Sequence, residues 1–328
     1  MLIAVALLAT VTPSALAAAD APPTVAGLQW AWAPGTIRTW FVDDEVHLPS
    51  YLWLTADRVK EARLIAYRLR TVYTCQLDQR ESAHSWQIDC AIDDLAISGA
   101  GFRSEKGILQ PVLEEMDRKL TGAHLQIVMR QDGRITNIDL EGVKTHNRRE
   151  SRMVEAMRII LSRSVAGFDL QLPRKGAAPD GVWGQYEGIL LMAPTDHGSQ
   201  GASEIAHVVR QVRGDKAIIE SAGKAMIVPP EQDQARNFFD TKLDSVAVFD
   251  TANGMLSERV WSARGTPTAS SALATGGRGI EYLQAGKIRY LPPDAARPDL
   301  GPTQEINLPK DETDSSILQW NPLGGKPR

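Results

Sequence analysis

The clearest signal in the sequence is a two-residue alternation of apolar and polar positions, which is typical of a β-strand with one buried face. Residues 65–77 carry mostly apolar or aromatic side chains at odd positions, with arginine, threonine and glutamine between them. Residues 86–92 show the same period on the even positions. Because a polar stretch around Ser82 separates the two runs, we predict that they pair as an antiparallel hairpin.

The two cysteines of the chain fall opposite each other in this hairpin. When the runs are aligned by their buried faces, Cys75 lies across from Cys90 and Leu77 lies across from Ile88. Directly opposed residues bring their sulfur atoms within reach of a bond. We therefore predict a disulfide between Cys75 and Cys90, for which two free buried thiols are the alternative.

Tight turns predict further hairpins along the chain. The expected turns are Asp132-Gly133, Gly214-Asp215, Asn253-Gly254 and Ala285-Gly286. The first of these sets Leu125 opposite Leu140, Ile127 opposite Ile138 and Met129 opposite Thr136. Strands do not alternate with long helices in this sequence, as a parallel sheet would require, so we expect an antiparallel sheet.

Two helices are expected within the series of strands. The first is predicted at residues 110–120, because Pro111 suits a first helical turn and Gly122 follows the end. The second is predicted at residues 147–166, because Asn147 and Glu150 have the spacing of a capping box.

The second helix carries an apolar stripe at helical spacing, which must be buried. Ordinary packing on the sheet is the simplest interpretation, since methionine fills irregular gaps in a core. The alternative is a helix that covers a bound ligand. The candidate ligand-binding residues on that hypothesis are Met153, Met157, Ile160 and Leu161.

These elements predict an α+β fold, with a mainly antiparallel curved sheet or half-open β-barrel and two inserted helices. The expected organisation is a signal peptide at 1–19, Trp-rich N-terminal strands at 20–58 packed on the main domain, an antiparallel β domain at 59–291 and a Pro-rich flexible tail at 292–328. Trp30, Trp32, Trp40 and Trp53 fall in the second segment. They are interpreted as core residues in preference to a sugar-binding platform.

The first residues indicate export from the cell. Residues 2–19 contain no charge, and their apolar core is too short to span a bilayer. Ala15 and Ala17 stand where an export peptidase requires small side chains. We therefore expect a periplasmic or extracellular protein with no transmembrane segment in its mature chain. Export also favours disulfide formation.

Charge and motifs exclude several classes of function. The 36 lysines and arginines nearly balance the 40 acidic residues, which makes nucleic acid an unsuitable partner. The six histidines form no zinc-binding motif, and we expect neither a metal nor a cofactor. Asp196, His197 and Ser199 are sequence neighbours and lack the geometry of a triad, so no catalytic residue is assigned. Glu204 and His207 are interpreted as solvent-facing residues of a strand.

An exported antiparallel sheet with two inserted helices resembles the half-open barrel of bacterial lipoprotein-carrier proteins, over about residues 59–291. The chain also resembles a broad set of secreted bacterial proteins in which a segment like 247–256 forms a late hairpin. The first resemblance implies a concave apolar face that accepts an acyl chain or another amphiphile beneath the helices.

Three hypotheses of function follow. The leading one is a non-enzymatic envelope protein that binds or carries a hydrophobic small molecule or acyl chain. The alternative is an envelope scaffold that contacts a protein partner and has no ligand cavity. A secreted hydrolase is the third, and it requires a histidine and an acidic side chain from distant segments to meet in one pocket.

Overall fold

The computed structural model describes residues 28–49, 64–82, 84–100, 110–173, 181–186, 200–228, 239–269 and 281–305. Eleven strands form one antiparallel sheet in the order β5-β4-β3-β2-β1-β11-β10-β9-β8-β7-β6, and a short twelfth strand pairs parallel with β3. The strands are β1 (Ile37–Pro49), β2 (Leu64–Ser82), β3 (Ser85–Ala100), β4 (His124–Arg130), β5 (Ile135–Glu141), β6 (Val182–Tyr186), β7 (Gln200–Arg213), β8 (Lys216–Val228), β9 (Phe239–Asp250), β10 (Met255–Pro267), β11 (Tyr282–Leu291) and β12 (Gln304–Glu305).

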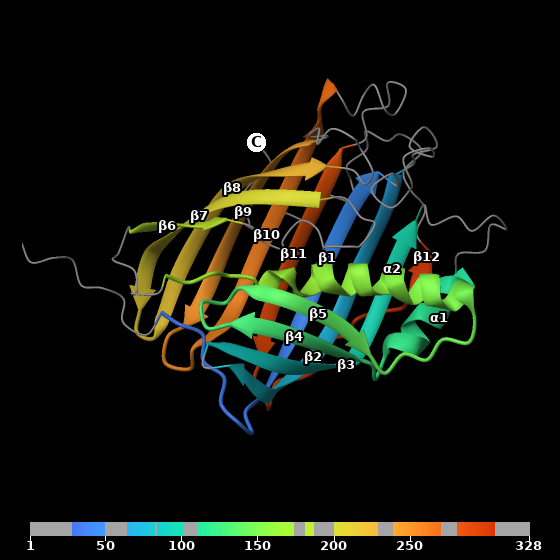
Figure 1. Ribbon diagram of the computed structural model, residues 1–328, viewed down its shortest axis with the longest axis horizontal. Coiled ribbons are helices and arrows are strands. Elements are labelled where there is room, and N and C mark those ends of the chain that lie inside the picture. Colours follow the sequence, from blue (N-terminus) through green and yellow to red (C-terminus); the bar gives the residue numbers. More distant parts are fainter. Residues whose placement is uncertain are drawn as a thin grey trace, which may run out of the picture.

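The sheet is strongly curved and does not close (Figure 1). Its path ends at β5 on one side and at β6 on the other, and in the described ranges these two edge strands do not pair with each other. The predicted α+β fold with a curved, half-open antiparallel sheet is therefore confirmed. Most neighbours along the path are consecutive in sequence, and the pairing of β1 with both β2 and β11 joins the early and late hairpins.

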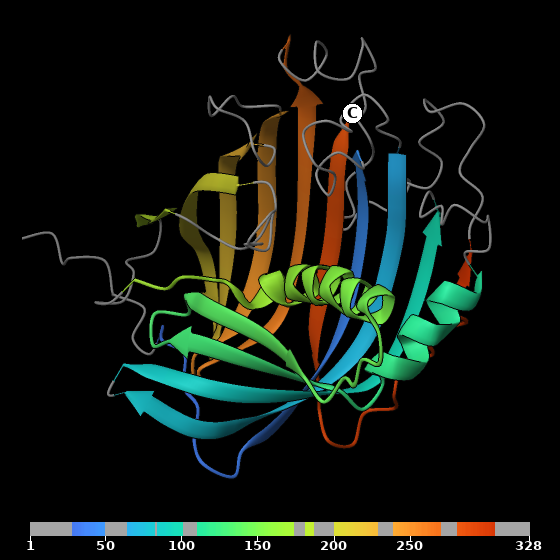
Figure 2. The same ribbon diagram turned by 45° about the vertical axis from the view of Figure 1, so that its right-hand side comes forward.

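Both predicted helices are present. Helix α1 spans Gln110–Leu120, and α2 spans Arg148–Ser164 before a short 3-10 turn, η3, at Val165–Phe168. Asn147 caps α2, since its side chain accepts a hydrogen bond from the backbone N–H of Glu150. Figure 2 shows α2 lying across the concave side of the sheet, in front of β11 and β1, with α1 at the side of β3.

The cysteine hairpin has the predicted register. Cys75 pairs with Cys90, Leu77 with Ile88 and Tyr73 with Ile92. The two cysteines form a disulfide, and both are buried. The hairpins at Gly214-Asp215 and Asn253-Gly254 are also present, as β7–β8 and β9–β10.

Two details of the turn analysis are wrong. Met129 pairs with Ile135 and not with Thr136, because the ladder between β4 and β5 is irregular after Val128. The Ala285-Gly286 pair is not a turn but lies inside the continuous strand β11. Gly286 stands opposite Trp261 of β10, and a side chain at this position would overlap the indole ring. The glycine makes room for a tryptophan, which a turn motif does not reveal.

The main core lies between the concave face and the helices. Trp40 is fully buried in β1, and its ring contacts Phe168 of η3 edge-on at 5.0 Å between centroids. Trp30 and Trp32 are also buried, in agreement with a core role. Residues 1–19 and Trp53 lie outside the described ranges, so the signal peptide and the proposed division into domains remain predictions.

The opposite, convex face carries a smaller apolar cluster. It consists of Val72, Ala96, Leu291 and Leu300, with Phe41 packed beside it. Leu300 belongs to the segment predicted as a tail, whose described residues 292–305 run against the sheet up to the parallel pairing of β12 with β3. Thr303 ties this segment to α1, because its hydroxyl donates to Asp117 at 2.6 Å.

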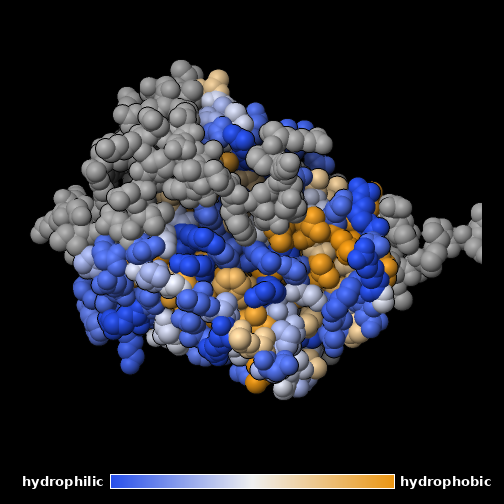
Figure 3. Space-filling view, turned by 180° about the vertical axis from the view of Figure 1, so that it is seen from behind, coloured by the Kyte–Doolittle hydropathy of each residue, from blue (hydrophilic) through white to orange (hydrophobic). Residues whose placement is uncertain are grey.

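Elsewhere the convex face is a mixture of apolar and charged side chains (Figure 3). Half-buried valine and isoleucine side chains point to this side from four adjacent strands. They are Val208, Ile218, Val246, Val248 and Val260. These strands therefore bury β-branched residues on one face and present others on the second face, which is why their alternation is weaker than that of β2.

The disulfide gives a first prediction. Replacing Cys75 and Cys90 by serine should lower the free energy of unfolding by about 3 kcal/mol, because the bond constrains the unfolded chain. The two residues are separated by 15 positions. Urea unfolding without reductant measures the difference. A reductant should destabilise the natural chain and leave the double variant unchanged, and equal stability of the two proteins would contradict a formed bond.

The contact of Gly286 with Trp261 gives a second prediction. Gly286→Ala should destabilise the fold by about 1–3 kcal/mol, since an added methyl group has to displace a buried ring. Ala285→Ser, on the convex face of the same strand, is the control and should change stability by less than about 0.5 kcal/mol. Thermal unfolding monitored by tryptophan fluorescence provides the measurement, and equal effects of both substitutions would contradict the packing.

Candidate functional site

The candidate site is the concave face beneath α2. Met157, Ile160 and Leu161 are buried there, each with an exposed fraction of 1% or less. Three of the four predicted ligand-binding residues thus share the buried side of the helix. The side chain of Met153 is outside what the structure describes. The position of the stripe fits either core packing or contact with a ligand, so a ligand-binding role for these residues remains a prediction.

The carboxyl-terminal end of α2 is fixed to the sheet by polar contacts. Tyr73 of β2 and Ser164 of α2 share a hydrogen bond of 2.6 Å. Arg259 of β10 is fully buried and donates to the backbone carbonyls of Gly167 and Asp169 at 3.2 and 3.1 Å. Burial lowers the pKa of Arg259 to about 10, so it remains a cation at neutral pH and holds carbonyl groups that follow the helix.

A second polar cluster joins α2 to the middle of the sheet. Tyr282 of β11 donates to Gln284 at 2.8 Å, and Gln284 donates to Asp44 of β1 at 3.1 Å. Arg163 of α2 interacts electrostatically with Asp44, Tyr282 and Tyr67 of β2. All five side chains have exposed fractions of 2% or less. Three strands and the helix therefore meet at one buried ionic group, which we call the Asp44 cluster.

Burial is the largest single influence on the pKa of each titratable group in this cluster. It raises the pKa of Asp44 to about 7, against the lowering effects of the Gln284 hydrogen bond and the Arg163 charge. Burial alone would lower the pKa of Arg163, but Tyr67, Tyr282 and Asp44 reverse the direction, and the guanidinium stays charged. Burial also raises the pKa of both tyrosines, which are neutral at pH 7.

Several buried polar atoms on this face have no hydrogen-bond partner. Within the described ranges these include Oδ2 of Asp44, Oγ of Ser162 and Oγ1 of Thr241. Buried polar groups in native proteins are usually paired with protein or with ordered molecules. The concave face therefore combines apolar surface with a few unsatisfied polar groups, which is the composition of many small-molecule sites.

A second polar pair lies further along the concave face. His207 of β7 and Ser221 of β8 share a hydrogen bond of 2.8 Å, and Trp183 of β6 stacks on the imidazole at 5.4 Å between ring centroids. The interpretation of His207 as solvent-facing is wrong, because the residue is fully buried. Glu204, for which the same solvent-facing position is predicted, is exposed. Because these two residues are three positions apart, strand alternation places them on opposite faces, and the odd positions of β7 are the ones that face the core.

The His207–Ser221 pair has the residue types of a hydrolase but not the electrostatics. Burial, and then the positive charge of Arg259, lower the pKa of His207 to about 3. A catalytic base must stabilise an imidazolium, and a neighbouring cation acts against that. Among the other described histidines, His47 contacts Glu45, His124 contacts Asp89 and His84 contacts Gln131. Asp196, His197 and Ser199 lie outside the described residues.

Metal binding and membrane spanning find no support in the described part of the chain. It contains no group of three or more histidine, cysteine or acidic side chains arranged to hold a metal ion. Neither of the two helices combines the length and the apolar character needed to cross a bilayer.

Sequence reasoning missed the Asp44 cluster, although the signal was present. Asp44 has the same parity as Trp40, Val42 and Val46, so the alternation places its carboxylate among buried side chains. Arg163 follows Ile160 by three residues and shares its side of the helix. A charged residue in phase with an apolar pattern is thus a usable indication of a buried polar site.

Comparisons with known proteins assign this chain to no family. No family model matches the sequence, and no curated protein is similar to it. One solved structure that aligns with this chain is lipovitellin, in a structure described as showing lipid–protein interactions. The TM-score is 0.43 and the sequence identity is 10%. The alignment covers 83% of this chain and 27% of lipovitellin, so this chain spans about a quarter of that protein. The similarity is too low to support an argument about function.

The Asp44 cluster gives a third prediction. The folded-state pKa of Asp44, about 7, exceeds the value of about 3.9 for an unfolded aspartate, so the folded state binds more protons between these values. Stability should therefore fall as the pH rises from 4 to 7, by up to about 4 kcal/mol from this residue. Asp44→Asn should remove that part of the slope.

Urea unfolding of both proteins at several pH values tests this. Asp139→Asn, an exposed position on β5, is the matched control and should leave the slope of the natural chain unchanged. Parallel stability profiles for the natural chain and Asp44→Asn would show that the Asp44 carboxyl does not titrate in this range.

Proposed function

We propose that this protein binds an amphiphilic ligand with an acyl chain between its concave sheet face and α2. The observation that carries the proposal is the combination on one face of a broad apolar surface with buried, unpartnered polar atoms at Asp44, Ser162 and Thr241. An amphiphile matches both parts, because its chain suits the apolar surface and its polar end suits the unsatisfied groups.

The apolar surface extends across the sheet beyond the helix. Val46, Leu69, Leu243 and Ile205 are all buried on the same side as the Asp44 cluster, and they come from β1, β2, β9 and β7. Transfer of an acyl chain from water to such a surface is favourable by about 0.8 kcal/mol for each buried CH₂ group. A chain of ordinary length therefore provides enough free energy for binding without further contacts.

The proposal includes export and a role in the cell envelope. The disulfide is compatible with an exported protein, and the leader predicted at residues 1–19 supports the same location. We assign no catalytic step, since the buried His207–Ser221 pair lies next to the cation Arg259. A scaffold that contacts a protein partner without a ligand cavity is the competing hypothesis.

A fourth prediction tests binding directly. The mature chain should bind a fluorescent fatty acid at a saturable site, and unlabelled saturated fatty acids from C10 to C16 should displace it with rising affinity. Each buried CH₂ group should strengthen binding about fourfold, from 0.8 kcal/mol. Leu161→Gln should weaken binding, because it places an amide on the buried side of α2.

The control is Gln211→Leu, which alters an exposed position on β7 by the reverse exchange and should bind as the natural chain does. Circular dichroism confirms that both variants are folded. Absence of saturable binding would exclude the carrier hypothesis and favour the scaffold. Binding that does not depend on chain length would contradict burial of the acyl chain in the apolar concavity.

A further inference from the structure

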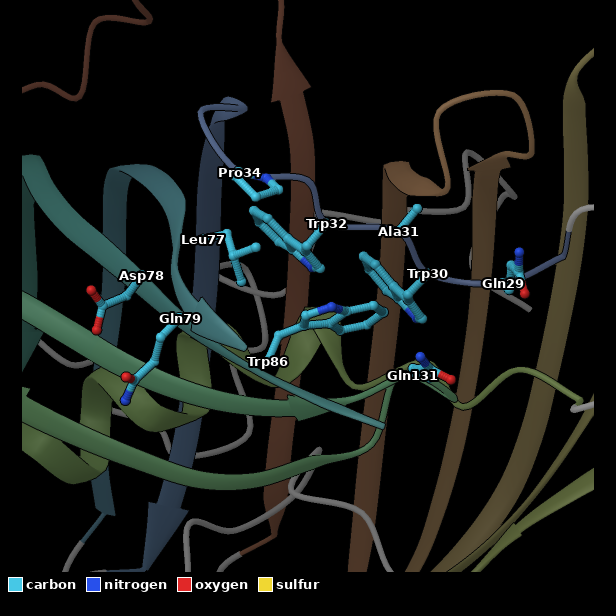
Figure 4. Close-up of a pocket in the computed structure, with 10 residues that line it drawn as sticks. All are labelled: Gln29, Trp30, Ala31, Trp32, Pro34, Leu77, Asp78, Gln79, Trp86 and Gln131. Carbon is cyan, nitrogen blue, oxygen red and sulfur yellow. The ribbon is translucent and has the colours of Figure 1, made fainter. Parts of the chain in front are cut away.

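For a ligand to lie between α2 and the sheet near Asp44, the helix has to move away from the sheet. The side chains of the Asp44 cluster have exposed fractions of 2% or less, so water does not reach them. A groove of about 510 Å³ lies between residues 29–34 and the β2–β3 hairpin (Figure 4), and no residue of the cluster lines it. Binding of the proposed amphiphile therefore includes a step in which α2 separates from the sheet.

The carboxyl group of Asp44 is buried in this contact. Asp44 pairs with Leu69 of β2 on one side and with Gly286 of β11 on the other. Leu69 is fully buried, and the indole of Trp261 fills the space above Gly286. Oδ1 of Asp44 accepts a hydrogen bond from Gln284 at 3.1 Å, whereas Oδ2 has no partner in the described structure. Apolar surroundings and one unpaired oxygen favour the neutral carboxylic acid over the carboxylate.

The groups that face this carboxyl are one cation, two anions and three phenols. Arg163 lies on α2, and its charge favours the ionised form of Asp44. Asp43 and Glu45, the neighbours of Asp44 along β1, oppose ionisation because they are like charges. The phenols are buried and neutral at pH 7, and they belong to Tyr67 and Tyr73 of β2 and Tyr282 of β11.

The proton on Asp44 links the position of α2 to pH. Burial outweighs the charge of Arg163, and the pKa of Asp44 in the closed structure is about 7. Once α2 has moved and water reaches the carboxyl, its pKa approaches the ordinary value of about 3.9. Between these values the closed state holds a proton that the open state releases. Because a rise in pH favours the state that has released the proton, opening becomes easier from pH 4 to pH 7.

We propose that binding of the amphiphile under α2 is coupled to release of the Asp44 proton, so that the protein binds its ligand near neutral pH and releases it on acidification. This inference rests on the proposed function, since it concerns the same site. The proton and the ligand compete without sharing a position, because each stabilises a different position of α2. One proton limits the effect to about tenfold in affinity for each pH unit.

Isothermal titration calorimetry of the mature chain with 1-decanol tests the coupling, because this amphiphile has no group that titrates in this range. Titrations at pH 6 in buffers of different ionisation enthalpy give the number of protons released. We expect about 0.9 proton for each 1-decanol bound, from the closed and open pKa values of Asp44. From pH 5 to pH 7 the affinity should rise about 50-fold.

Asp44→Asn isolates the carboxyl group. An amide does not ionise, so this variant should release no proton on binding and should have one affinity from pH 5 to pH 7. At pH 7 it should bind 1-decanol at least about tenfold more weakly than the natural chain. Asp139→Asn makes the same exchange at an exposed position on β5 and should reproduce the natural chain. Circular dichroism checks folding, and the proton count of the natural chain requires no variant.

Two results would overturn the inference and leave the acyl-chain site in place. One is saturable binding of 1-decanol without proton release and with equal or falling affinity from pH 5 to pH 7. The other is proton release of the same size from Asp44→Asn, which would assign the proton to another group. Absence of saturable 1-decanol binding by the natural chain at pH 7 would instead remove the proposed function, and this inference with it.

Discussion

An open sheet with one apolar face has to cover that face, and in this protein the cover depends on the attachment of α2 and η3. A closed barrel removes both edges and encloses its interior by itself, whereas this sheet ends at β5 and β6. The apolar stripe of α2 is buried in this contact. Its position along the sheet is set by polar links, above all by Arg259, which holds the carbonyls of Gly167 and Asp169.

Most of the architecture follows from local pattern. The alternation in β2 and β3 and the polar turn near Ser82 together predict the hairpin and the Cys75–Cys90 pairing. A period of two excludes every register shifted by an odd number of residues, and the position of the turn selects among the rest. Gly286 was misread as a turn because its role depends on Trp261, a residue on another strand. Sequence patterns report on neighbours along a strand, while close packing across strands is decided by the complete sheet.

The candidate sites also differ in whether a pattern along one element reveals them or only the packing of several elements does. The stripe on α2 is visible in the sequence, since helical spacing alone groups Met157, Ile160 and Leu161. The Asp44 cluster is visible only in part: the alternation places Asp44 among buried residues, but no local pattern predicts that β1, β2, β11 and α2 meet. Chemistry that depends on distant segments therefore needs the fold before it can be recognised.

The mixed character of the contact between α2 and the sheet also determines how easily the two separate. Exposing Met157, Ile160 and Leu161 to water costs about 6 kcal/mol, at about 2 kcal/mol for each side chain. The same movement returns Arg163 and Asp44 to water, and the hydration of these groups offsets part of that cost. A wholly apolar contact would have no such compensation. The proposed ligand site requires this separation, which therefore costs less free energy because ionic groups lie within the apolar contact.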